Sequence, residues 1–294
     1  MGGTGFIGFH LAKKCLKKGW SVTSLSRRKA NKKRFIKQVD YIRCDITKKN
    51  ELIKKINKNY EYVINLGGNV DHSNSQETYI SHYIGLKNLV KIFSNKNLIR
   101  FVQIGSGGEY GNAKVPHKEN SQCKPSSIYY KSKYLSTLYL LKQNRKKKFP
   151  ATILRLYQAY GPKQDINRLI PIVIKNCIKD KKFKCTSGKQ FRDFIFIDDV
   201  VNAIIKSLLI KNAIGEVFNL GTGNFYQVKK IIEYIRIRVK KGFPLYGSIR
   251  IRNDELNKVY PSIKKIYKKL KWKPKFSLTR GLSETINHYK KQNV

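Results

Sequence analysis

The chain has 294 residues, of which 40% are hydrophobic and 12% aromatic, a composition typical of a folded protein with a substantial core. Its 62 lysines and arginines outweigh 18 acidic residues and give a formal net charge of +44. Because the lysines are scattered over nearly every expected helix and form no basic–aromatic platform, we interpret this charge as a solvated surface. We expect no nucleic-acid partner.

Features of membrane and secreted proteins are also missing from the sequence. No apolar run reaches the ~20 residues that span a bilayer, and glycines follow Met1 where a signal peptide would begin. The five cysteines form no C-x-x-C pair, and the five histidines do not cluster. We therefore expect reduced thiols, no metal, no membrane partner and a cytoplasmic location.

The first expected element is a glycine loop that opens a helix ending near Lys18. Its backbone N–H groups and positive dipole end suit a pyrophosphate. Such a loop normally follows a buried parallel strand, and here only Met1 precedes it. We therefore expect the first, central strand of the sheet to be missing, with a gap or a forced closure in its place. The loop residues expected to bind a cofactor are Gly2, Gly5, Phe6, Ile7 and Gly8.

Two arginines follow the next expected strand, Ser21–Ser26. An acidic residue at the end of this strand binds the ribose 2′-hydroxyl of NAD, whereas arginines suit the 2′-phosphate of NADP. Arg27 and Arg28 stand here without an acid, which favours NADP and leaves NAD open. An exposed basic turn in a lysine-rich chain is the alternative interpretation.

Strands and helices then alternate at the spacing of parallel βαβ units. Strands are expected at 41–44, 62–66 and 101–104, and helices at 49–57 and 77–93. This alternation predicts an α/β protein with a Rossmann-like, doubly wound parallel sheet.

A tyrosine and a lysine on the following helix, expected to run to about Leu141, carry the clearest chemistry. Tyr129 and Lys133 are four residues apart and therefore share one helix face. A lysine ammonium beside a phenol stabilises the phenolate and lowers its pKa, which makes the tyrosine a general acid/base for a sugar hydroxyl. The pair is common by chance, but here it follows a glycine loop and Ser106, at the end of an expected strand.

Over essentially its whole length, the chain resembles the extended short-chain dehydrogenase/reductases of the NAD-dependent epimerase/dehydratase family, which act on nucleotide-linked sugars. The resemblance rests on the glycine loop, on Tyr129 with Lys133, and on several shorter motifs. These motifs are Asp45-Ile46, Leu66-Gly67-Gly68, Ser106 with Tyr110-Gly111, Tyr160-Gly161-Pro162, Arg192-Asp193-Phe194 and Trp272-Lys273-Pro274.

The resemblance implies roles for the matched catalytic and adenine-binding residues. Tyr129 is expected to be the acid/base, and Lys133 to tune it and hold the nicotinamide ribose. Ser106 is expected to hydrogen-bond the reacting sugar oxygen. Asp45 would bind the adenine amine, with Ile46 beside the adenine ring.

The family pattern also implies a division of the chain. We expect an NAD(P)-binding Rossmann domain over residues 1–155, in which Leu66, Gly67 and Gly68 also bind the cofactor. Residues 156–294 would form mainly a smaller substrate-binding lobe, with segments that return to the sheet. Arg192 and Arg252 are candidates for the substrate diphosphate, since a guanidinium pairs with two phosphate oxygens; two exposed arginines in a basic protein are the alternative.

Two departures from the family pattern affect the expected reaction. Dehydratases of the family carry an acidic pair directly after the Ser106 position, whereas this chain has Gly107-Gly108, with Glu109 one place late. Dehydration is therefore not expected. His82 stands where the family usually has an asparagine, a change that we expect the fold to tolerate.

Three functions remain open from the sequence. The favoured one is an NAD(P)-dependent reductase of a nucleotide-linked 4-keto-6-deoxyhexose, since the carboxyl-terminal motifs resemble CDP-abequose synthase-type reductases. A UDP-glucose-type 4-epimerase, which retains its cofactor, is the alternative. The third is an N-terminally truncated, inactive copy, although a start codon assigned too late is the preferred explanation of the missing strand. Whether the chain forms a homodimer also stays open.

Overall fold

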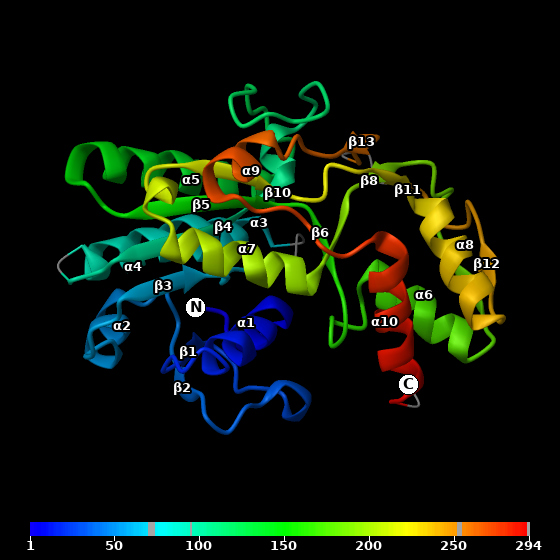
Figure 1. The fold of residues 1–294 in the computed structure, drawn as a ribbon, viewed down its shortest axis with the longest axis horizontal. Coiled ribbons are helices and arrows are strands. Elements are labelled where there is room, and N and C mark those ends of the chain that lie inside the picture. Colours follow the sequence, from blue (N-terminus) through cyan, green and yellow to red (C-terminus); the bar gives the residue numbers. More distant parts are fainter. Residues whose placement is uncertain (70–73, 95, 252–254, 293–294) are drawn as a thin grey trace.

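The computed structural model describes residues 1–69, 74–94, 96–251 and 255–292. Parallel strands form the centre of the molecule, helices cover them, and a smaller lobe lies at one end (Figure 1). The α/β architecture predicted from the sequence is confirmed. No helix in this part of the chain is long and apolar enough to cross a membrane.

The main sheet contains four parallel strands in the order β10 (Val217–Leu220), β5 (Ala151–Leu156), β4 (Arg100–Ser106) and β3 (Tyr62–Asn65). Its central strands β4 and β5 are buried along nearly their whole length, as expected for strands covered on both faces. The last residue of β4 is Ser106, so the parallel topology brings this residue to the edge where the other strands also end.

The sheet is interrupted beside β3. The strands β1 (Thr23–Ser26) and β2 (Asp40–Arg43) pair in parallel with each other, and no strand within the described ranges joins them to β3. The gap predicted from the missing first strand is therefore present in the structure.

The first two residues hold the separated strands together. The Met1 amino group donates to the Ile64 carbonyl (2.6 Å), and the Leu66 N–H donates to the Met1 carbonyl (3.1 Å). On the other side, the Gly2 N–H donates to the Leu25 carbonyl (2.9 Å). This alternation is the hydrogen-bond pattern of parallel strands. Next to these residues lies a cavity lined mostly by apolar side chains of α1, β1 and β3.

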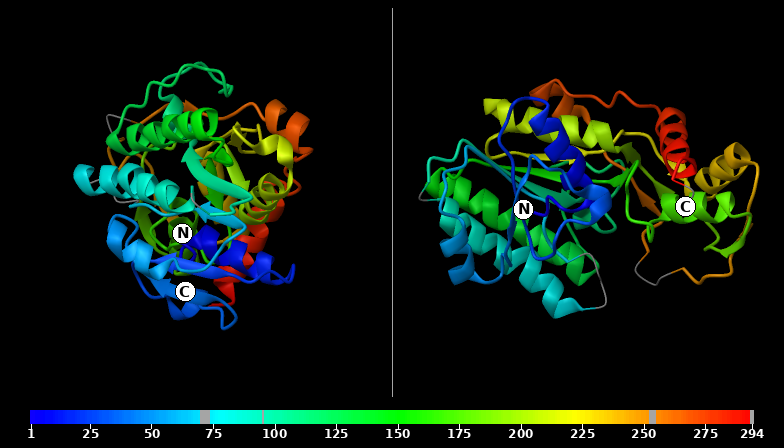
Figure 2. Two further views of the ribbon diagram at one scale, coloured as in Figure 1. Left: turned by 90° about the vertical axis from the view of Figure 1, so that its left-hand side faces the viewer. Right: turned by 90° about the horizontal axis from the view of Figure 1, so that it is seen from below.

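Helices cover both faces of the sheet and enclose separate hydrophobic clusters. On one face, α1 (Phe6–Leu16) packs against α7 (Ile197–Leu209). On the other lie α2 (Lys49–Lys55), α4 (Gly85–Phe93) and α5 (Ile128–Lys147). The left-hand view of Figure 2 shows α4 and α5 on one side of the strands and α7 on the other. The doubly wound arrangement is therefore confirmed.

The helix expected at 77–93 is present but is not uniform. It consists of α3 (Ser75–Tyr79), a π-helical turn (Ile80–Ile84) and α4, which follow one another without a break. His82 lies in the middle of the π-helical turn.

The helix α5 is longer than the sequence predicted. Its expected end near Leu141 is wrong, because the helix continues to Lys147. Lysine, arginine and glutamine are good helix formers, so a basic run does not by itself end a helix. Lys148, in the left-handed conformation, ends it.

The smaller lobe gathers at one end of the molecule, away from α2 and α4 (Figure 1). Its helices α6, α8 and α10 contact one another, and α7 and β10 return from this half of the chain to the main sheet. The remaining elements are α6 (Leu169–Ile178), α8 (Val228–Val239), α9 (Lys264–Leu270), α10 (Leu278–Lys290), β6 (Gln158–Tyr160), β7 (Lys182–Lys184), β8 (Phe191–Arg192), β9 (Phe194–Phe196), β11 (Tyr226–Gln227), β12 (Phe243–Leu245) and β13 (Lys258–Val259).

Candidate active site

A cleft of about 1480 Å³ lies at the carboxyl ends of β1, β2 and β3. It collects the residues that the sequence predicted to bind a dinucleotide, apart from the catalytic pair. The helix α1 begins here without a side-chain cap, which leaves first-turn N–H groups available to a pyrophosphate. The residues predicted for this role that line the cleft are Gly2, Gly5, Phe6, Ile7, Gly8, Arg27, Arg28, Asp45, Ile46, Leu66, Gly67 and Gly68.

At the end of β1, the cleft carries two cationic side chains and no acid from β1 itself. Arg27 forms an ion pair with Glu77 of α3 (2.8 Å), and both side chains are 43% exposed. The Ser26 hydroxyl donates to the Arg28 carbonyl (2.7 Å), which shapes the turn. Glu77 therefore offsets part of the positive charge of Arg27. The positive charge of Arg28 also lies at this corner of the cleft.

Asp45, predicted to bind the adenine amine, is also engaged by its own turn. Its Oδ1 accepts hydrogen bonds from the Thr47 N–H (2.9 Å) and hydroxyl (2.8 Å). These bonds hold the carboxylate at the edge of the cleft, beside Ile46.

A second cleft of about 1480 Å³ brings the predicted catalytic residues together. Ser106 comes from the end of β4, and Tyr129 and Lys133 from the first turns of α5. The Ser127 hydroxyl caps α5 by accepting from the Tyr130 N–H (3.3 Å), which places the reacting face of the helix at the strand end. Leu66, Gly68 and Gln158 are among the residues that line both clefts, so the two are continuous.

The Tyr129–Lys133 pair lies on one helix face, as the spacing predicts, but its electrostatics differ from the prediction. The Lys133 ammonium lies 5.9 Å from the centre of the Tyr129 ring and donates to the Ile104 carbonyl (2.8 Å). Burial raises the pKa of Tyr129 above its ordinary value, and burial also lowers the pKa of Lys133 to about 8, with Glu109 opposing. The expected lowering of the Tyr129 pKa by Lys133 is therefore wrong for this arrangement, because burial of the phenol is the larger effect.

The His82 ring lines the second cleft. Its Nε2 lies 2.7 Å from the Asn69 carbonyl oxygen, and its ring meets the Tyr129 ring edge-on at 5.1 Å between centroids. Its backbone carbonyl accepts from the Ser136 hydroxyl of α5 (3.1 Å). The imidazole thus contacts Tyr129, and the backbone carbonyl of His82 ties this turn to α5.

The two glycines after Ser106 are required by their neighbours. A Cβ at Gly107 would lie 2.7 Å from the Tyr157 ring, and a Cβ at Gly108 would lie 2.0 Å from the Tyr130 ring. Both distances are below any normal contact, so side chains at these positions would displace the rings. The site therefore has aromatic rings where the dehydratase pattern places its acidic pair.

Arg192, predicted to bind the substrate diphosphate, lies on β8 between the catalytic cleft and a third hollow of about 1200 Å³ in the smaller lobe. It forms an ion pair with Glu255, and its Nη1 donates to the Phe191 carbonyl (2.7 Å). Arg252 lies outside the described residues.

Arg168 is a lining residue that the sequence analysis did not identify. It stands at the N-cap of α6 and lines the cofactor cleft, the catalytic cleft and the hollow in the lobe. It belongs to the charges that lower the pKa of Tyr129. No motif marks it, because a single arginine after Tyr160-Gly161-Pro162 has no special spacing.

Comparisons with known proteins identify the family of this chain and its fold. The model of the NAD dependent epimerase/dehydratase family matches residues 1–221. The chain is 30% identical to a putative UDP-glucose 4-epimerase of Methanocaldococcus jannaschii, over 99% of this chain and 98% of that protein. It is 33% identical to CDP-abequose synthase of Salmonella typhimurium, over 45% of this chain and 46% of the relative.

Solved structures share the whole fold. The UDP-glucose 4-epimerase of Thermotoga maritima, determined with UDP-glucose, superposes with a TM-score of 0.94 at 25% identity, over 100% of this chain and 98% of that one. The Thermus thermophilus UDP-glucose 4-epimerase, in complex with NAD, gives a TM-score of 0.90 at 21% identity, over 98% and 97% of the two chains.

Proposed function

Because this chain belongs to the NAD-dependent epimerase/dehydratase family, we propose that it is a nucleotide-sugar oxidoreductase in which Tyr129 is the general acid/base. The favoured reaction is the reduction of a nucleotide-linked 4-keto-6-deoxyhexose. One observation carries this choice: the cleft that holds Ser106, Tyr129 and Lys133 has aromatic rings at the dehydratase positions and opens onto a cofactor cleft with arginines at the end of β1.

The residues of the site divide the work of a carbonyl reduction. A bound nicotinamide supplies the hydride for C4 of the sugar. Tyr129 gives its phenolic proton to the C4 oxygen, and the high pKa that burial imposes keeps that proton on the phenol until it is needed. Ser106 donates a hydrogen bond to the same oxygen, and the Lys133 ammonium stabilises the tyrosinate left behind.

NADP is the proposed cofactor, in preference to NAD. Arg27 and Arg28 line the end of the cleft where the adenine ribose would lie, and β1 offers no carboxylate for a 2′-hydroxyl. Residues 1–155 would bind this cofactor, and residues 156–294 mainly the nucleotide sugar, with Arg192 beside the diphosphate.

A 4-epimerase is the second candidate. It is favoured by the similarity to a putative UDP-glucose 4-epimerase over almost the whole chain, whereas the similarity to CDP-abequose synthase covers less than half. The same three residues would then serve in both directions, with Tyr129 first removing and later returning the proton.

Net cofactor consumption separates the two candidates. The test is to assay the chain with NADPH and with NADH against CDP-, dTDP-, UDP- and GDP-linked 4-keto-6-deoxyhexoses, and separately against UDP-glucose. A reductase oxidises NADPH in proportion to the keto-sugar consumed. Interconversion of UDP-sugars without net oxidation would replace the reductase by the epimerase, and a lack of any turnover would contradict both.

Two variants test the role of the tyrosine. Tyr129→Phe should lower kcat by about 10²- to 10⁴-fold, because the proton donor is removed. Tyr134→Phe, on the same helix but not among the residues lining either cleft, should leave kcat unchanged. Equal loss in both variants would assign the effect to the helix and not to proton transfer.

A further inference from the structure

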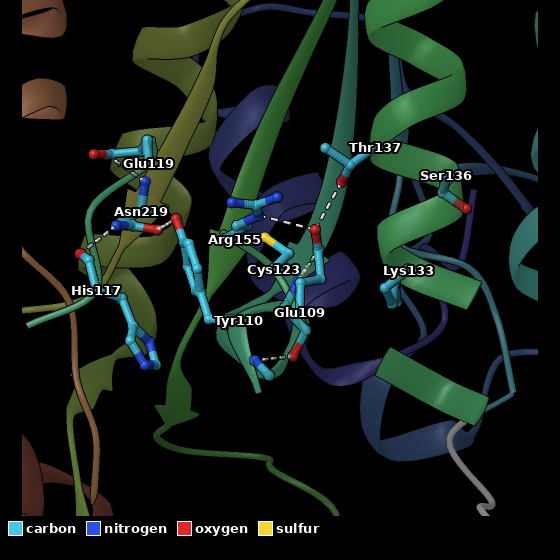
Figure 3. Close-up of polar contacts among 12 residues, drawn as sticks. Glu109, Tyr110, His117, Glu119, Cys123, Lys133, Ser136, Thr137, Arg155 and Asn219 are labelled. Carbon is cyan, nitrogen blue, oxygen red and sulfur yellow. Dashed lines mark hydrogen bonds and ion pairs between the residues drawn. The ribbon is translucent and has the colours of Figure 1, made fainter. Parts of the chain in front are cut away.

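Glu109 is the acidic residue closest in sequence to Ser106, yet it does not face the sugar. Its side chain is fully buried beneath the turn Gly107–Tyr110, and it is absent from the lining of the catalytic cleft. Figure 3 shows its carboxylate between β5 and α5, where Arg155 and Thr137 approach it. It is therefore unsuited to act directly on substrate, and its burial needs another explanation.

Both oxygens of the carboxylate are used. Oε1 accepts from the Ser106 N–H (2.8 Å), so Glu109 closes the cap of the turn in which Ser106 stands. Oε2 accepts from the Thr137 hydroxyl (2.9 Å) and from the Arg155 Nε (2.8 Å). A Cβ at Gly105 would lie 2.4 Å from Oε1, so the strand makes room for this oxygen.

Two of these partners come from the elements that carry the proposed catalytic residues, and the third comes from the neighbouring strand β5. Ser106 ends β4 and Arg155 belongs to β5, whereas Thr137 lies on α5 one helical turn after Lys133. Because residues four apart share a helix face, the bond to Thr137 fixes the face that also presents Lys133. One carboxylate therefore joins the serine to the helix of the acid/base pair.

We infer that Glu109 is a positioning residue of this site, whose buried carboxylate holds Ser106 in register with the Tyr129–Lys133 helix. The inference rests on the proposed function, since it assigns Ser106 and Lys133 the roles given above. It goes beyond that function because Glu109 lines neither the catalytic cleft nor the cofactor cleft.

The charge of Glu109 also acts on Lys133. The Lys133 ammonium donates to the Ile104 carbonyl (2.8 Å) and lies 5.9 Å from the centre of the Tyr129 ring, and Glu109 is a charged group that acts on it. Burial lowers the Lys133 pKa to about 8, and Glu109 opposes this shift. Removing the charge should therefore move the loss of the Lys133 proton to lower pH.

The central test is Glu109→Gln, which keeps the shape of the side chain and removes its charge. It should lower kcat by about 10- to 100-fold with KM changed by no more than about two-fold, because the reacting groups lose their alignment. The basic limb of the kcat profile should move to lower pH. A wild-type kcat and an unmoved limb would overturn the inference.

Glu109→Gln leaves Arg155 without its ion-pair partner, and that variant can fail to fold. A matched pair of variants at Thr137 then tests the inference. Thr137→Val removes one bond to the carboxylate and keeps its charge, whereas Thr137→Ser keeps the hydroxyl. The valine variant should lose kcat by about 3- to 10-fold without a shift of the pH limb, and the serine variant should match wild type. Equal activity of the two would overturn the inference.

Hydrogen exchange of the Ser106 amide separates failure of this inference from failure of the proposed function. That N–H is bonded to Glu109, so peptides covering residues 104–110 should exchange faster in Thr137→Val than in Thr137→Ser or wild type. This readout needs no turnover. Faster exchange in a protein inert toward every sugar would contradict the proposed function alone, and equal exchange in all three would contradict the positioning role.

Discussion

The structure joins its elements in two contrasting ways on either side of β3. At the interrupted edge, β1 and β3 are connected by backbone hydrogen bonds of Met1 and Gly2, and an apolar cavity lies beside them. At the catalytic corner, β4, β5 and α5 are connected through Glu109 and its buried partners. The proposed cofactor-binding half therefore rests on a loop at a partly unsupported edge of the sheet. The proposed catalytic half is built around a buried carboxylate whose two oxygens both accept hydrogen bonds.

Breaking the catalytic corner should have the largest effect on stability. Arg155→Met removes the cation beside Glu109, whose side chain is fully buried, and leaves a carboxylate without its ion-pair partner. The free energy of unfolding should fall by about 3–5 kcal/mol. Urea denaturation measures the change.

The matched control for this variant is Arg27→Met, which breaks a half-exposed ion pair with Glu77 at the cofactor end. Its effect should stay within about 1 kcal/mol, because exposed ion pairs contribute little. Similar losses in both variants would show that the buried corner is not the better-supported region.

Filling the interrupted edge should have the next largest effect, in the opposite direction. An extension of five valine and isoleucine residues fused before Met1 can continue the hydrogen-bond pattern of Met1 and Gly2 and place side chains in the cavity. Burial contributes about 1.5–3 kcal/mol for each such side chain, offset by the ordering of the added residues. We expect a net gain of about 2–4 kcal/mol in the free energy of unfolding.

A glycine–serine extension of the same length is the control, since it offers backbone groups but no apolar side chains. It should change the urea midpoint little. If both extensions change the urea midpoint by the same amount, the cavity does not limit the stability of this edge.

The pH dependence of stability should give the smallest effects within any one pH unit, through Met1 at the interrupted edge and through His117. Burial lowers the pKa of the Met1 amino group from 8.0 to about 5 and that of His117, which is bonded to the Tyr157 hydroxyl, from 6.5 to about 4. In both windows the unfolded chain binds more protons, so stability falls as pH decreases. Each group should contribute a slope of up to about 1.4 kcal/mol per pH unit, between pH 8 and 5 for Met1 and between pH 6.5 and 4 for His117.

The apolar extension sharpens this comparison. It converts the Met1 amine into an amide, so the decline between pH 8 and 6.5 should disappear while the decline below pH 6.5 remains. Urea midpoints of the chain with and without the extension, measured at pH 8, 6.5 and 5, test this expectation. An unchanged decline above pH 6.5 would show that another group titrates there.

Patterns that act over short distances were sufficient to predict much of the fold. Gly2–Gly8 marked the start of α1, apolar runs marked β3 and β4, and the four-residue spacing placed Tyr129 and Lys133 on one face. The gap beside β3 was also predictable, because a glycine loop of this kind normally follows a buried strand.

Properties that depend on distant partners were not predictable. Glu109 resembles a misplaced catalytic acid until β5 and α5 supply Arg155 and Thr137 at distances of 2.8 and 2.9 Å. The Tyr129 pKa was predicted in the wrong direction, because the spacing to Lys133 is visible in the sequence and the burial of the phenol is not. Arg168 gained its position only from the folding of the smaller lobe.

The π-helical turn Ile80–Ile84 has a consequence for aligning this chain with its relatives. A π turn is an α-helix with one residue added, so a relative can lack that residue and still keep both α3 and α4. In such a relative, the residue that contacts the tyrosine would not be aligned with His82 in a sequence alignment without gaps. To match His82 with the asparagine usual in the family, the structures should be superposed on Gly68 and the tyrosine. Any single-residue gap in the alignment then belongs inside this turn.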